Sequence, residues 1–106
     1  MKLNIKERLM TLGLIPEKGN IITLRVVREL SNKVSFTSKE IKDFDISSDE
    51  TGMVRWDSEK TKDLEFDIDI TEAELGIIKS ELIKLNDSSE LTLEHESIYK
   101  KFVESV

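Results

Sequence analysis

The sequence contains no cysteine, one histidine and four scattered glycines among its 106 residues. Without cysteine the chain cannot form disulfides, thiolate zinc sites, iron–sulfur clusters or a thiol nucleophile. A single histidine excludes metal sites built from several histidines and leaves one candidate for proton transfer near neutral pH. The scattered glycines form no phosphate-binding loop. We therefore expect a protein that is not an enzyme and that holds no cofactor or metal.

Long apolar runs are also absent. No stretch approaches the roughly 18 apolar residues of a membrane span, and charged residues interrupt the first ten positions, unlike a signal peptide. We therefore expect a soluble, cytoplasmic protein with no membrane partner. A chain of this length, with 38% hydrophobic residues, suits one compact domain over residues 1–106.

Charge is distributed unevenly along the chain. Residues 1–35 have a net charge of +4 and residues 36–106 a net charge of -10, which together give -6. Residues 40–74 contain thirteen acidic residues and four Lys/Arg. Negative charge repels a phosphate backbone, so binding to nucleic acid is disfavoured. The acidic stretch instead favours a protein partner with a basic surface.

Apolar spacing of the helical type predicts five helices. Gly13 is placed at the left-handed C-terminal cap of the first helix. Thr37 and Thr71 begin capping boxes at the starts of the third and fourth helices. The last helix aligns Ile98, Phe102 and Val106 on one face. The predicted ranges are 2–12, 21–34, 38–44, 72–86 and 93–105.

Alternating polar and apolar residues predict strands between the third and fourth helices. Residues 44–46 and 54–56 flank a turn and are typical of a hairpin. Residues 63–70 alternate strictly, with one apolar face and one acidic face. The order predicts an α+β fold: three N-terminal helices, a small antiparallel sheet of about three strands and two C-terminal helices.

The acidic face of the strand over residues 63–70 is the first candidate for recognition. Glu65, Asp67 and Asp69 lie about 7 Å apart, which is too far for two of them to chelate one small ion. Trp56 is the only tryptophan and is a candidate interface anchor. We expect these four residues to form a partner-binding surface, the alternative being a solvated strand face and a core tryptophan. Nearly all apolar side chains are expected in the core, which leaves charge as the means of recognition.

Two other candidate functions use the N-terminal half. Arg25 and Arg28 share a helix face and suit a nucleotide-like anion, bound by an oligomeric sequestering protein; alternatively they pair with the acidic half. The short connection between the second and third helices suggests a DNA-contacting helix-turn-helix. The negative net charge argues against this DNA-binding function.

Two further motifs favour structural interpretations. His95 lies between Glu94 and Glu96 but has no second histidine nearby, so an exposed residue at a helix start is favoured over a catalytic base. Four residues resemble the start of a calcium loop, but Ser48 replaces its glycine and Val54 its glutamate, so a solvent-facing hairpin is favoured. Those four residues are Asp43, Asp45, Ser47 and Asp49.

Three stretches together resemble small accessory proteins encoded by tailed phages and prophages: Lys6–Leu30, Val54-Arg55-Trp56 and Leu91–Phe102. The resemblance implies a small protein that acts inside an infected bacterium by binding host or phage factors. It implies no established activity, so no functional residue transfers from it.

Overall fold

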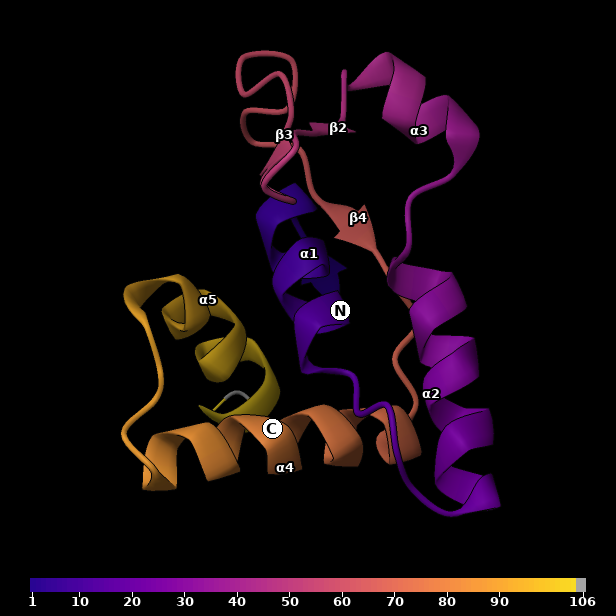
Figure 1. Cartoon of the computed structure of the whole chain (residues 1–106), viewed down its shortest axis with the longest axis vertical. Coiled ribbons are helices and arrows are strands. Elements are labelled where there is room, and N and C mark those ends of the chain that lie inside the picture. Colours follow the sequence, from indigo (N-terminus) through magenta and orange to yellow (C-terminus); the bar gives the residue numbers. More distant parts are fainter. Residues whose placement is uncertain (105–106) are drawn as a thin grey trace.

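The computed structural model describes residues 1–104 and divides into a helical bundle and a smaller lobe (Figure 1). Helices α1, α2 and α4 and the C-terminal helical segment form the bundle, with α4 lying across the end of α1 and beginning beside α2. Residues 36–65 form the lobe, at the top of Figure 1. The elements in chain order are β1 (Lys2–Leu3), α1 (Ile5–Leu14), α2 (Ile21–Val34), α3 (Ser38–Asp43), β2 (Ser47–Ser48), β3 (Val54–Arg55), β4 (Phe66–Asp67), α4 (Glu72–Asp87), η1 (Leu93–His95), α5 (Glu96–Tyr99) and η2 (Lys100–Glu104).

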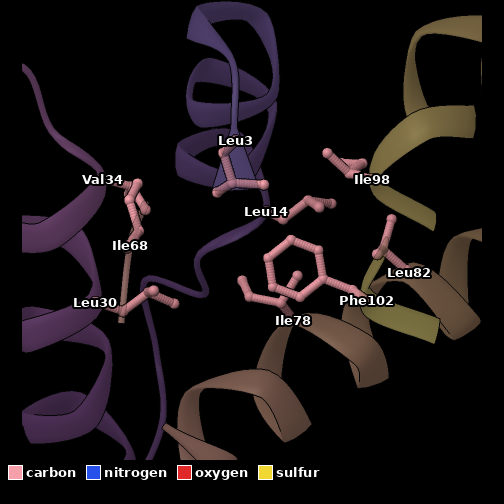
Figure 2. Close-up of a cluster of buried hydrophobic side chains, with 9 residues drawn as sticks. All are labelled: Leu3, Leu14, Leu30, Val34, Ile68, Ile78, Leu82, Ile98 and Phe102. Atoms are coloured by element: carbon pink, nitrogen blue, oxygen red, sulfur yellow. The ribbon is translucent and has the colours of Figure 1, made fainter. Parts of the chain in front are cut away.

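The bundle contains the hydrophobic core. Each of its side chains contributes about 1.5–3 kcal/mol on burial, which makes the bundle the main source of stability. Figure 2 shows the ring of Phe102 at the centre of this cluster. The core side chains are Leu3, Leu14, Leu30, Val34, Ile68, Ile78, Leu82, Ile98 and Phe102.

Three predicted helices agree with the structure to within one residue at each end. The α2 bounds agree with the predicted 21–34, and α3 and α4 begin at the predicted residues behind Thr37 and Thr71. Both threonine side chains accept a backbone N–H in a complete capping box. The buried residues of α2 are Val27, Leu30 and Val34, whereas Ile22 in its first turn is 70% exposed.

The prediction for the first helix is wrong at both ends. Residues 2 and 3 form strand β1, and α1 begins at Ile5 behind an Asn4 cap. Gly13 lies inside the helix rather than at a left-handed cap. The helix instead ends before Ile15, which is extended because the residue preceding a proline disfavours the helical region.

The sheet also differs from the prediction. In place of one three-stranded sheet, the described residues form two antiparallel pairs, β1–β4 and β2–β3. A hairpin is present, but its first strand is Ser47–Ser48 rather than the predicted residues 44–46, while the second, Val54–Arg55, lies within the predicted 54–56. Of the strand predicted over residues 63–70, only Phe66–Asp67 pairs, with β1. The class is still mixed helix and antiparallel strand.

The predicted fifth helix is not one regular α-helix. A 3₁₀ turn, four α-helical residues and a π-helical turn follow one another over η1, α5 and η2. Ile98 and Phe102 are both fully buried, so this segment packs on its own chain. Residues 105–106, and with them the predicted alignment of Val106, lie outside the described residues.

The lobe lacks a core of its own. None of the aliphatic or aromatic side chains in residues 36–65, all of which are described, is buried. Nearly complete burial of apolar residues was therefore a wrong expectation, since Ile41 and Met53 of the lobe are among the exposed ones. Among residues 1–104, no helix is both long enough and apolar enough to cross a bilayer.

Candidate binding surface

Trp56 and Glu65 line the same groove, of about 490 Å³. One wall is the start of α1, Asn4 to Lys6, and the other is the loop that follows β3. We call this the Trp56 groove. Two of the four residues predicted to bind a partner are thus together, whereas Asp67, in β4, and Asp69, two residues after it, lie outside the groove.

Asp57 shapes the loop beside Trp56. Its backbone N–H donates to the Phe44 carbonyl at 2.9 Å, which extends the hairpin by one bond. Its carboxylate accepts the N–H groups of Glu59 and Lys60 at 3.0 and 3.1 Å, a side-chain turn that reverses the chain. Thr61 donates its hydroxyl proton to the Asp57 carbonyl at 2.9 Å. These bonds hold the groove wall in one conformation.

The acidic strand face is exposed, as predicted, but its charges are partly compensated. The Glu65 carboxylate accepts from the Lys101 ammonium at 3.2 Å. The Asp67 carboxylate lies 3.4 Å from the N-terminal ammonium of the chain. The Lys33 ammonium donates to the Asp69 backbone carbonyl at 2.8 Å. Asp67 nevertheless remains 80% exposed in its side chain, so most of this face is open to solvent.

Three buried or half-buried glutamates each bond to a helix cap and to a distant cation. Each is the third residue of its helix, and one oxygen of each accepts the backbone N–H of the capping residue at 2.9 Å. Each also accepts from a cation on a distant element at 2.8 Å. The capping boxes of Glu40 and Glu74 were predicted, but the distant cations have no local sequence signal. The pairs are Glu7–Lys101, Glu40–Arg8 and Glu74–Lys33.

Arg8 joins the lobe to the bundle. Its guanidinium donates to both oxygens of Glu40, at 2.8 and 3.2 Å. It also donates to the carbonyls of Val34 and Ser35, at 3.1 and 2.7 Å, where α2 ends and leaves carbonyls without helical partners. The same side chain therefore caps α2 and fixes the start of α3.

Aromatic rings enclose the Arg8 guanidinium. Its carbon lies 4.2 Å from the centre of the Phe36 ring and 4.6 Å from that of Phe66. The Phe44 ring meets Phe66 edge-on, with centres 5.8 Å apart. Stacking of this kind suits the flat, weakly hydrated guanidinium. Arg8 and these rings replace the missing apolar core of the lobe.

The two arginines predicted to bind an anion do not meet the acidic half. Arg25 and Arg28 are exposed on α2, and within residues 1–104 no ion pair joins either of them to a carboxylate. Lys33 of the same helix does pair, with Glu74. The anion-binding alternative stays a prediction.

His95 and the calcium-like stretch have structural roles. His95 begins a helical segment as expected, but it is half-buried rather than exposed. Its Nδ1 atom accepts the Thr92 backbone N–H at 3.0 Å and so caps this segment. Asp49 accepts the backbone N–H groups of Thr51 and Met53 at 2.9 and 3.0 Å, which closes the hairpin turn. Among residues 1–104, no three acidic or histidine side chains converge as metal ligands do.

Comparison with known proteins adds no relative. The chain matches no protein family, and neither a curated protein nor a solved structure matches it.

Proposed function

We propose that this chain is a non-enzymatic accessory protein, of the phage type that its sequence resembles, which binds a basic-surfaced host protein and modulates it. The observation that supports this most is the meeting of Trp56 and Glu65 in one groove beside the exposed acidic face. No bound small molecule is needed for this function.

The Trp56 groove has the parts of a protein-recognition site. A half-buried tryptophan offers a large apolar area with little loss of side-chain entropy, which is why tryptophan is enriched among interface residues of high energy. The lining includes both Lys6 and Lys62 and both Asp63 and Glu65, so its own charge is balanced. The preference for a basic partner therefore comes from the acidic face beyond it, which steers association.

Reversing the charge of that face tests the proposal. The triple variant Glu65→Lys, Asp67→Lys, Asp69→Lys is expected to reduce capture of the natural partner at least about tenfold, because like charges then oppose each other across the interface. The new lysines also lie beside Lys101, the N-terminal ammonium and Lys33, so the thermal midpoint should fall. Capture is therefore compared at a temperature at which the variant remains folded. The measurement is affinity capture from the natural host, quantified by mass spectrometry.

A matched control has the same change in net charge elsewhere. The triple variant Asp87→Lys, Glu90→Lys, Glu104→Lys alters exposed acidic residues that lie outside the acidic face and outside the Trp56 groove. It should capture the partner as the parent does. Equal capture by both triple variants, or equal loss in both, would reject the proposed surface.

A further inference from the structure

A second groove opens where the lobe meets the bundle. It has a volume of about 360 Å³ and lies between α1, α3 and the β2–β3 hairpin. Leu9 and Leu12, one turn apart on α1, form one wall, while Ile41 and Val54 belong to the lobe. None of its lining residues is charged. We call it the apolar groove.

The apolar groove is exposed because the lobe does not cover its own hydrophobic side chains. Ile41 is 44% exposed at the groove, and Met53, next to Val54, is 60% exposed. Six of the nine residues that line the groove are apolar and three are serines, and an exposed apolar surface with a polar rim is typical of an interaction site. The groove lies at the junction where Arg8 donates to Glu40 and to the carbonyl of Ser35, a residue that lines the groove.

The charges of the β2–β3 hairpin and of the segment before it indicate which charge a bound partner should have. From residue 43 to residue 55 the chain has four carboxylates and one guanidinium, a net charge of -3. Three of these carboxylates also lie in exposed ion pairs, with Lys39, Lys60 and Arg55 at 3.7, 3.2 and 3.9 Å, and such pairs leave most of the charge open to solvent. All five side chains belong to exposed residues. A partner segment seated in the groove therefore meets mainly apolar side chains, next to a hairpin of negative net charge. The charged residues are Asp43, Asp45, Asp49, Glu50 and Arg55.

We propose that the apolar groove binds a basic amphipathic helix of the protein partner. This inference rests on the proposed function in one respect, namely that the partner is a basic-surfaced protein. It adds that the groove binds a helix of that partner. A volume of about 360 Å³ accommodates two or three large apolar side chains at helical spacing. Lysine and arginine side chains on the flank of that helix face the carboxylates of the hairpin.

Synthetic peptides test the inference without the natural partner. The probe is a leucine–lysine peptide of about 16 residues with leucines along one helical face. Two control peptides are a scrambled version of the same composition and a leucine–glutamate version with the same apolar face. In titrations followed by NMR, only the leucine–lysine helix should bind, and it should shift the methyl signals of Leu9, Ile41 and Val54 but not the indole N–H of Trp56.

Variants of the groove sharpen the test. Ile41→Ser and Val54→Thr should each weaken the peptide about fivefold or more, whereas Ile22→Ser, at an exposed isoleucine of α2 outside the groove, should change affinity less than about twofold. Val54→Thr keeps the β-branched shape but adds a hydroxyl, so the thermal midpoint of each variant is measured beside its affinity to separate a folding defect from lost binding.

Several results would overturn the inference: equal binding of the scrambled or acidic peptide, shifts confined to the Trp56 groove, or unchanged affinity in both groove variants. Self-association of the chain that Ile41→Ser abolishes, without peptide binding, would assign the groove to a second copy instead. Failure here would reject the apolar groove alone, because capture of the natural partner and its dependence on Glu65 are measured separately.

Discussion

Replacing Arg8 with alanine is expected to lower the free energy of unfolding by about 3–5 kcal/mol, because it removes one partner of a buried ion pair. The Arg8 residue is 3% exposed. The variant leaves the Val34 and Ser35 carbonyls without their donor and opens a void between the rings of Phe36 and Phe66. Urea denaturation followed by circular dichroism measures the loss.

Two variants control for charge and for position. Arg8→Lys keeps the positive charge but not the planar fork, so it should fall between the parent and Arg8→Ala. Arg28→Ala removes an exposed arginine from α2 and should change stability by no more than about 0.5 kcal/mol. If Arg8→Ala were as stable as Arg28→Ala, Arg8 would not join the lobe to the bundle.

Replacing Glu74 with glutamine is expected to cost roughly 1–3 kcal/mol, because a buried charge-assisted hydrogen bond becomes a neutral one. Glu74 is 1% exposed and accepts from Thr71 and Lys33 at 2.9 and 2.8 Å. The matched control is Glu72→Gln, in the same first turn but exposed, with an expected cost of at most about 0.5 kcal/mol. Equal costs in the two variants would contradict the assigned role of Glu74.

The Glu74 carboxylate should also make stability depend on pH in the acid range. Burial raises the pKa of Glu74, but the hydrogen bonds from Lys33 and Thr71 outweigh it and leave the pKa below 4.5. The hydrogen bond from Arg8 likewise lowers the pKa of Glu40 below 4.5, against the effect of burial. The unfolded chain therefore takes up these protons first as the pH falls.

The stability that these carboxylates contribute is fully present above the pKa of the unfolded chain and is lost as the pH falls through the folded values. Unfolding free energies measured between about pH 6 and pH 3 should decline below about pH 4.5 in the parent, and less steeply in Glu74→Gln. Identical slopes in the two proteins would show that Glu74 does not titrate in this way.

Local signals in the sequence account for the elements that were predicted well. The capping boxes at Thr37 and Thr71 depend on residues three apart, so they can be read without the fold. The α2 helix follows from apolar spacing within fourteen residues. Strand β1 could not be predicted in this way, because two residues show no period and their partner, β4, lies more than sixty positions away.

The candidate surfaces show the same limit. Alternation along residues 63–70 correctly predicted that Glu65, Asp67 and Asp69 are exposed. The second wall of the Trp56 groove, formed by the start of α1, depends on tertiary packing and gives no sequence signal. Arg8 has the spacing of a polar residue on a helix surface, and only the closing of the lobe over α1 buries it.

Hydrogen exchange tests most directly the division of roles between a bundle that supplies stability and a lobe that binds the partner. In the free chain, amides of residues 36–65 should exchange faster than those of α1 and α4, because the lobe opens without unfolding the bundle. Bound to the captured partner, the chain should gain protection in the lobe and in β4 but not in α4 or α5. A lobe that exchanges as slowly as the bundle, or protection gained only on α4 and α5, would contradict the account.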